Sequence, residues 1–241
     1  MNDWQSPASF KQLHDNEIHV WLFHLNTTPP AIKRFYPLLS DAEKARSERL
    51  VHFMHRKRFI AAHGFMRSVL ALYIQQPAES LQFDKGEHGK PFLVNNLTIH
   101  FNLSHSQDIA MLAVASRDTG IDIECINRKH EWQKIMHRFY TESEQQKILA
   151  LPDNLQQRAF YQVWTRKEAH MKVTGQGLHL APGQFTVSVP PEPAVLLDAK
   201  IKQDINRWNM YDIELPPSAK DYCACASLNG PADHVMKFLF S

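Results

Sequence analysis

The chain has 241 residues, of which 44% are hydrophobic and 22% are charged, and its formal net charge at pH 7 is +2. This length provides one large or two small domains with a proper core, and the near-neutral charge disfavours a nucleic-acid binder. Three cysteines, no signal-peptide pattern and no apolar run near the ~20 residues of a membrane span argue against a disulfide scaffold and a membrane protein, which makes the cytoplasm the simplest compartment.

The first third of the chain predicts a strand followed by basic helices. Branched and aromatic residues fill positions 18–25, which indicates a strand. Ser40-Asp-Ala-Glu43 matches a capping box that opens a helix, and apolar residues at helical spacing predict a second helix from about Arg56 to Gln75. Lysine and arginine residues gather between Lys44 and Arg67. Solvated helix faces account for most of them, and one or two could reach a phosphate or an acidic partner.

The middle of the chain carries two acids on a predicted strand. Three shorter strands or hairpin arms are expected before it, over 81–83, 97–104 and 109–115. In Gly120-Ile-Asp-Ile-Glu124, the period of two puts both carboxylates on one face and both isoleucines toward the core. Carboxylates held side by side repel each other unless a cation lies between them, and Mg²⁺ is the natural oxygen-preferring ion. A solvated strand face is the alternative interpretation of Asp122 and Glu124 taken alone.

A helix is predicted from about Gln157 to Thr174, ended by Gly175 and Gly177. One face of this helix carries residues spaced three or four apart, namely Tyr161, Trp164, Glu168 and Lys172. The alternative interpretation of the last two is a surface ion pair that contributes only ~0.3 kcal/mol. The paired acids upstream favour a functional interpretation, in which a three-carboxylate site is formed by Asp122, Glu124 and Glu168.

Both parts of the chain read as a strand, then helices, then strands. A helix is expected around 132–139, and a second capping box at Thr141–Glu144 opens the next one. Later strands are expected over 184–189, 195–201, 208–213 and 222–228. The clearest division gives two lobes, 1–117 and 118–241, with the paired acids at their junction. Clefts between lobes commonly hold ligands.

Three motifs span residues 89 to 178. They are Gly89-Lys-Pro91 followed by Phe101-Asn-Leu-Ser-His-Ser106, then Gly120-Ile-Asp-Ile-Glu124, then Trp164-x-x-Lys-Glu-Ala-x-x-Lys172-x-x-Gly-x-Gly-Leu178. In this order they resemble the 4′-phosphopantetheinyl transferases of the larger, surfactin-synthetase-activating (Sfp) type. The resemblance implies an α+β fold made of a pseudo-twofold pair of similar α/β lobes in one monomeric chain.

The resemblance also implies a reaction. The 4′-phosphopantetheine group of coenzyme A would pass to a serine of an apo acyl, peptidyl or aryl carrier protein, giving the holo carrier and adenosine 3′,5′-bisphosphate. Coenzyme A would be the co-substrate, and Mg²⁺ or Mn²⁺ the metal. Carriers of fatty acid, polyketide, peptide synthetase and lysine pathways share a short, acidic, helical recognition surface, so the sequence leaves the carrier open.

The motifs carry expected roles over to particular residues. Metal binding is expected from Asp122, Glu124 and Glu168, and catalysis from Asp122, Glu168 and Lys172. Either Glu168 or a water that it polarises would accept the proton of the carrier serine. Contacts with coenzyme A are expected from Arg46, Lys85, Lys90, Asn102, Ser104, His105, Asp122, Glu168 and Lys172, with Ser104, His105 and Arg46 at the 3′-phosphate. Glu144 matches an acidic position near the metal, but its capping box explains it equally well. Gln107 stands where relatives often have glycine.

Two other functions stay open at this point. One is a catalytically idle coenzyme A-binding regulatory protein on the same fold, although such a protein would have no chemical need for the three carboxylates and Lys172. The other is a pyrophosphate hydrolase, which would cleave coenzyme A without an acceptor protein. An apo carrier incubated with coenzyme A and Mg²⁺ discriminates between them.

Overall fold

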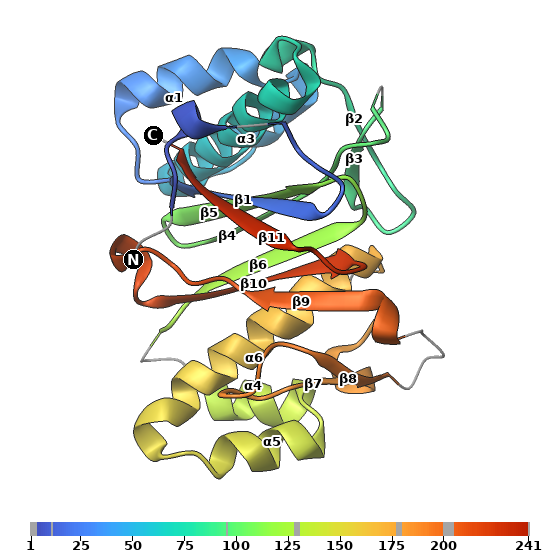
Figure 1. Ribbon diagram of the computed structural model, residues 1–241. Helices are drawn as coiled ribbons and strands as arrows, with labels where there is room; N and C mark the ends of the chain where they lie inside the picture. The colour runs from blue at the N-terminus through green and yellow to red at the C-terminus, as the bar shows by residue number, and fades with distance from the viewer. Residues whose placement is uncertain are drawn as a thin grey trace.

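The computed structural model describes residues 4–10, 12–94, 96–127, 131–176, 180–199 and 205–240. Two β-sheets lie face to face in the middle of the molecule, with helices on the outer side of each (Figure 1). The first sheet has the strand order β11-β1-β5-β4, with β1 at Glu17–His24, β4 at His100–Ser106, β5 at Ile109–Ala115 and β11 at His234–Phe240. The second has the order β6-β10-β9, with β6 at Thr119–Cys125, β9 at Trp208–Asp212 and β10 at Tyr222–Asn229.

Each sheet is covered by a helix of 22 residues. The first sheet packs against α3, which is preceded by two shorter helices, and the second against α6, which is likewise preceded by two. The bounds are α1 Pro29–Phe35, α2 Asp41–Glu48, α3 Phe53–Ile74, α4 Trp132–Phe139, α5 Glu142–Leu149 and α6 Asp153–Thr174. Both predicted capping boxes are present, at the starts of α2 and α5. Gly175, with a φ of 69°, ends α6 as expected, whereas Gly177 and Leu178 lie outside the described residues.

Short elements connect these layers. Two small hairpins pair β2 with β3 and β7 with β8, at Phe83–Lys85, Pro91–Leu93, Phe185–Val187 and Leu196–Ala199. Single 3₁₀ turns lie at Pro7–Ser9, Tyr36–Leu38, Ala78–Ser80, Pro182–Gln184, Ile205–Arg207 and Pro217–Ala219. The strand expected over 195–201 extends partly beyond the described residues. Within the described part of the chain, no helix is long and apolar enough to cross a membrane.

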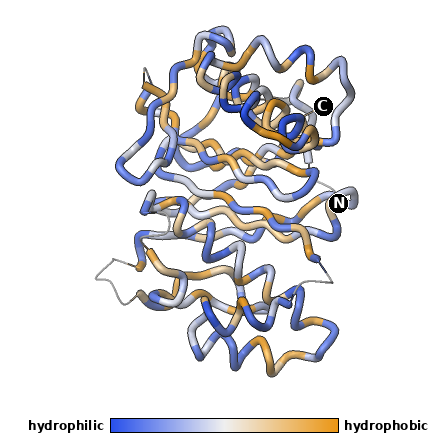
Figure 2. The backbone as a smooth tube through the Cα atoms, turned by 180° about the vertical axis from the view of Figure 1, so that it is seen from behind, coloured by the Kyte–Doolittle hydropathy of each residue, from blue (hydrophilic) through white to orange (hydrophobic). Residues whose placement is uncertain are grey.

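Three apolar cores fill the spaces between the layers. One lies between α3 and the first sheet, one between the second sheet and its helices, and one between the two sheets. Figure 2 shows the hydrophobic segments concentrated along the central strands. Ile121 and Ile123 are fully buried in the core between the sheets, so the alternation in β6 turns Asp122 and Glu124 to the opposite face, where α6 lies.

Strand β11 returns to the first sheet. It pairs in parallel with β1, from Glu17 opposite His234 to Phe23 opposite Phe240. The sequence division at 117/118 therefore does not describe every contact, because a strand from the second part completes the sheet of the first. No strand was predicted for 234–240, although these residues are rich in branched and aromatic side chains.

Both long helices are anchored by a buried basic residue. In the first part, Arg67 donates to Oε2 of the capping-box residue Glu43 at 2.7 Å and to the carbonyl oxygens of Ala78 and Leu81. In the second, Nζ of Lys167 lies 2.8 Å from Oε1 of Glu144 and donates to the carbonyl oxygens of Pro182 and Phe185. Glu144 is thus a core residue that caps α5 and pairs with α6, and of its two sequence interpretations the capping-box one describes the structure.

Candidate active site

Helix α6 lies directly against strand β6 because residue 120 is glycine. A Cβ atom at Gly120 would come within 2.5 Å of the backbone nitrogen of Val173 and would collide with the carbonyl oxygen of Ala169. The missing side chain lets the two backbones approach each other. The C-terminal part of α6, which carries Glu168 and Lys172, is thereby held beside the carboxylates of β6.

Lys172 and Asp122 form a buried ion pair at the centre of this contact. Nζ of Lys172 lies 2.5 Å from Oδ1 of Asp122 and donates to the hydroxyl of Ser104 at 2.9 Å, and Ser104 donates to the same Oδ1 at 2.8 Å. Asp122 is only 2% exposed. The ammonium group is therefore directed across to β6, which differs from the surface Glu-to-Lys pair along α6 that the spacing alone allowed. Oδ2 of Asp122 is buried and has no hydrogen-bond partner.

Alternate side chains of β4 bind the edge of β6. The contacts join Asn102 to Ile121, Ser104 to Asp122, and Ser106 to both Glu124 and Cys125. Oδ1 of Asn102 accepts the N–H of Ile121 at 2.8 Å, and the hydroxyl of Ser106 donates to Oε2 of Glu124 at 2.7 Å while accepting the N–H of Cys125 at 3.1 Å. Side chains of the first sheet thus replace a backbone ladder and fix the second sheet where the acids lie.

Asn102 and Ser104 were expected at coenzyme A, and here their polar atoms face β6. Their contacts with coenzyme A stay a prediction. Sequence reasoning missed Ser106 as a site residue, although its place at the end of the same motif, two residues after Ser104 on a strand, puts it on the same face.

The carboxylates of Glu124 and Glu168 are electrostatically strained toward the protonated form. Burial and then the charge of Asp122 raise the pKa of Glu124 to about 7, against a hydrogen bond from Ser106. Burial and Asp122 also raise the pKa of Glu168, against the charge of Lys172. Three carboxyl groups that influence one another within one partly desolvated region indicate that positive charge is in deficit there.

The donor set was tested for its fit to a divalent cation. Among the described residues, no group of three Asp, Glu, His or Cys side chains stands close enough together to hold a metal ion, so the expected three-carboxylate cluster is not assembled. Two observations still fit an oxygen-bound cation: the unpartnered Oδ2 of Asp122 and the raised pKa values of Glu124 and Glu168. Oxygen ligands of this kind suit Mg²⁺ or Mn²⁺.

A basic cavity of about 420 Å³ lies beside the site, between the start of α3 and the end of β4. Its wall includes Arg58, Phe59 and His105. The surrounding low dielectric lowers the pKa of His105, and so do the nearby positive charges of Lys172, His63 and Arg58. The guanidinium of Arg46 stacks over the Phe59 ring at 5.3 Å. This concentration of cationic groups next to Lys172 suits a polyanionic ligand.

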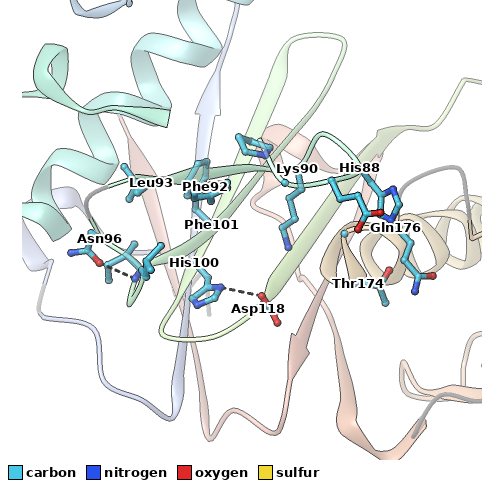
Figure 3. Close-up of a pocket in the computed structure, with 16 residues that line it drawn as sticks. His88, Lys90, Phe92, Leu93, Asn96, His100, Phe101, Asp118, Thr174 and Gln176 are labelled. Carbon is cyan, nitrogen blue, oxygen red and sulfur yellow. Dashed lines mark hydrogen bonds and ion pairs between the residues drawn. The ribbon is translucent and has the colours of Figure 1, made fainter. Parts of the chain in front are cut away.

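Lys90 lies at the other end of β6, in a cavity of about 590 Å³ that Figure 3 shows. Its Nζ donates to the carbonyl oxygens of Thr119 at 2.8 Å and of Val173 at 3.4 Å, so it ties the start of β6 to the end of α6. Burial lowers its pKa to about 8, although Asp118 opposes this shift. Lys85, the other expected lysine, is exposed on β2.

An aromatic cavity of about 290 Å³ adjoins Glu124 on the side of α6. Tyr161 and Trp164, two of the residues predicted to share a helix face with Glu168, line it. It shares Ser106 and Gln107 with the basic cavity, so the two form a continuous groove over the β4–β5 turn. Gln107 has a φ of 49°, a left-handed conformation that explains why glycine suits this position.

Comparisons with known proteins identify the class to which this fold and site belong. Residues 118–227 match the family model described as the 4′-phosphopantetheinyl transferase superfamily, and residues 26–117 match that of its N-terminal part. The junction of the two matches lies at the division predicted from sequence.

Curated relatives agree. The 4′-phosphopantetheinyl transferase HetI of Nostoc sp. is 33% identical over 91% of this chain and 90% of its own length. The transferase Sfp of Bacillus subtilis is 30% identical over 85% and 89%. A holo-[acyl-carrier-protein] synthase of Thermotoga maritima overlaps 47% of this chain and 63% of its own at 17% identity, with a TM-score of 0.37. This chain belongs to the 4′-phosphopantetheinyl transferase superfamily and is an enzyme of that class.

Proposed function

We propose that this chain transfers the 4′-phosphopantetheine group of coenzyme A to a serine of an apo carrier protein, with the contact between β6 and α6 as its active site. The observation that carries the proposal is the cluster of Lys172, Asp122 and Ser104 beside Glu124 and Glu168. It combines a cation, oxygen donors and buried carboxylates where a pyrophosphate has to be bound and cleaved.

The chemistry is a phosphoryl transfer that balances within the two substrates. The serine oxygen forms a bond to the β-phosphorus of coenzyme A, and the bond from that phosphorus to the bridging oxygen breaks. The leaving group is adenosine 3′,5′-bisphosphate. We assign acceptance of the serine proton to Glu168, directly or through a water, because its raised pKa suits a general base. Lys172, on the same helix, is positioned to neutralise the leaving oxygen.

The residues that would hold Mg²⁺ are Asp122, through its unpartnered Oδ2, with Glu124 and Glu168. When bound, the ion would supply charge neutralisation and Lewis-acid polarisation of the pyrophosphate. The chain's own contribution is to orient these carboxylates. Ser104 and Ser106 hold Asp122 and Glu124 by one hydrogen bond each.

The nucleotide end of coenzyme A is assigned to the basic cavity. Arg46 and His105 would meet the 3′-phosphate, because both belong to the cationic wall next to Lys172. Lys90 and Lys85 would lie toward the nucleotide, and Asn102 and Ser104 would line the path between. The aromatic cavity by Trp164 leaves room for the pantetheine arm.

We further propose that the chain is monomeric, of the Sfp type, and built from two similar lobes, 1–117 and 118–241, related by a pseudo-twofold axis. The parallel order of elements supports this, as does the recurrence of one anchoring device. Glu43 with Arg67 in the first part corresponds to Glu144 with Lys167 in the second. Light scattering in solution tests the monomer.

The deciding experiment is mass spectrometry of an apo carrier protein incubated with coenzyme A, Mg²⁺ and this enzyme. A phosphopantetheine adduct on the carrier serine is expected, with adenosine 3′,5′-bisphosphate released in equal amount. Cleavage of coenzyme A with no modified carrier would instead indicate a hydrolase, and binding without cleavage would indicate a regulatory protein. A panel of acyl, peptidyl and aryl carriers identifies the preferred class.

A further inference from the structure

A fully exposed apolar segment precedes α3. Residues 51–55 are all exposed, and three of the five are large and hydrophobic. Val51 is 93% exposed, Phe53 75% and Met54 42%. Val51 and Phe53 have the largest exposed fractions among the large hydrophobic side chains of the described chain. Folding gives no reason for their exposure, and a contiguous exposed apolar patch of this kind marks an interaction site.

The charge around this segment has one sign. From Arg49 to Ala78 the sequence contains no aspartate or glutamate. Arg49 is exposed and Arg56 and Lys57 are half-buried, so they flank the apolar segment with positive charge. A partner that fits this surface presents hydrophobic side chains bordered by carboxylates, because that arrangement buries the apolar area and meets each charge with its opposite.

The segment adjoins the active site. Leu50, just before it, and His55, at its end, line the basic cavity together with His105 and Gln107. That cavity continues over Gln107 to the wall of Glu124 and Trp164. A protein seated on residues 51–55 would therefore stand at one mouth of the groove whose floor holds the reacting groups.

We propose that residues 49–57 form the docking surface for the carrier protein, which binds through an acidic helix that places apolar side chains on Val51, Phe53 and Met54. This proposal rests on the transferase function above and adds the place where the protein substrate is held. Arg49, Arg56 and Lys57 pair with carboxylates at the rim, where they set the association rate and the salt dependence, while the apolar centre supplies most of the affinity.

The test compares the double variant Val51→Ser/Phe53→Ser with wild type, using an apo carrier that the wild-type enzyme modifies. Both side chains are exposed, so the substitutions leave the fold intact. The KM for the carrier is expected to rise at least tenfold, while the KM for coenzyme A and kcat at saturating carrier change less than twofold. The matched control is Leu149→Ser, on a side chain that is 48% exposed at the end of α5, which leaves all three constants unchanged.

A charge variant tests the rim separately. Arg56→Glu/Lys57→Glu is expected to raise the KM for the carrier and to reverse its dependence on salt, because screening then weakens repulsion instead of attraction. Carrier KM values within twofold of wild type in both double variants would overturn the docking surface while leaving the transferase function standing. Absence of transfer by wild type would overturn the function itself.

The same exposed residues could contact anionic lipid, which the experiment also decides. Wild type and Val51→Ser/Phe53→Ser are sedimented with phosphatidylserine vesicles and with neutral phosphatidylcholine vesicles. We expect no difference between the two proteins. Vesicle binding that the double variant loses, together with an unchanged KM for the carrier, would identify a lipid-binding surface and reject the carrier.

Discussion

Ser106 of β4 donates its hydroxyl to the carboxylate of Glu124 on β6 at 2.7 Å. The two residues belong to different sheets, so this bond joins the two layers at the site. The same oxygen accepts the N–H of Cys125, which leaves the hydroxyl one orientation. Glu124 is thereby held with one oxygen bonded to the protein.

The first prediction follows from that contact. In Ser106→Ala, Glu124 loses a charge-assisted hydrogen bond worth about 1.5–3 kcal/mol, so we expect kcat/KM for coenzyme A to fall roughly 10- to 100-fold. The concentration of Mg²⁺ that gives half-maximal rate should rise as well. Ser106→Thr keeps the hydroxyl and is expected to recover most of the rate. An alanine variant with wild-type kinetics would show that Glu124 needs no support.

The second prediction concerns the assigned base. Glu168→Gln keeps the size of the side chain and removes its basicity, so kcat should fall by ~10²–10⁴. The affinity for coenzyme A should stay within a few-fold, because Lys172 and Asp122 are untouched. Single-turnover transfer and calorimetric titration of coenzyme A measure the two effects. Asp122→Ala, which leaves Lys172 without its partner, is expected to abolish transfer, and retained transfer in either variant would remove that residue from the mechanism.

The third prediction locates the 3′-phosphate. Arg46→Ala removes the guanidinium that stacks on Phe59 at the basic cavity. Binding of coenzyme A should weaken by about tenfold, as expected for loss of a charged hydrogen bond of 1.5 kcal/mol or more, while binding of 3′-dephospho-coenzyme A should hardly change. Equal losses for both ligands would place Arg46 elsewhere. Lys44→Ala, two residues earlier on the same helix, serves as the control.

The fourth prediction is structural. Glu144 and Lys167 are 0% and 1% exposed at their side chains, so Glu144→Gln leaves a buried ammonium group without its carboxylate. Removing one member of a buried pair costs about 3–5 kcal/mol. Urea unfolding should show a loss of this size, whereas Glu142→Gln, on the exposed side of the same helix, should change the stability by less than about 0.5 kcal/mol. A small effect at Glu144 would mean that Lys167 finds another partner.

The fifth prediction is the pH dependence of stability. Burial raises the pKa of Glu43, but hydrogen bonds from His63 and Ser40 and the charge of Arg67 outweigh it and lower the pKa to about 2. Because the pKa is depressed on folding, the ionised carboxylate stabilises the protein fully above pH ~4.5, and this contribution, at most about 3 kcal/mol, disappears as the pH falls toward 2. The difference in unfolding free energy between wild type and Glu43→Gln should shrink over that interval.

Urea titrations between pH 2.5 and pH 6 measure it. A difference that stays constant across the interval would show that Glu43 is not held ionised. Asp84→Asn, on the exposed β2 strand, controls for general charge effects.

Local patterns predicted much of this fold. The capping boxes at Ser40 and Thr141, the strand at 109–115 and the alternation in β6 all depend on neighbours a few residues away, and the structure confirms them. Boundaries moved where side chains intervened. Asn96 accepts hydrogen bonds from the backbone of Thr98 and Ile99, which holds a turn there and delays β4 to His100. Helix α3 begins at Phe53, earlier than expected, because His52 at its cap gives no capping signal.

The relations that build the site are non-local, which is why sequence reasoning found the residues but not their contacts. Nothing in the motif says that Asn102 bonds to a backbone 19 residues away, or that Gly120 makes room for α6. The partner of Lys172 was equally open, since Glu168 is four residues distant on the same helix and Asp122 is fifty away.

The parallel pairing of β11 with β1 has a consequence for biosynthesis. The edge of β1 waits for a partner that the ribosome makes more than two hundred residues later, so the earliest sheet to begin is the last to close. During translation that edge stays open to wrong pairing, and a nascent chain arrested before His234 would expose it permanently. A chaperone that shields unpaired edges would find its substrate here, in the half that leaves the tunnel first.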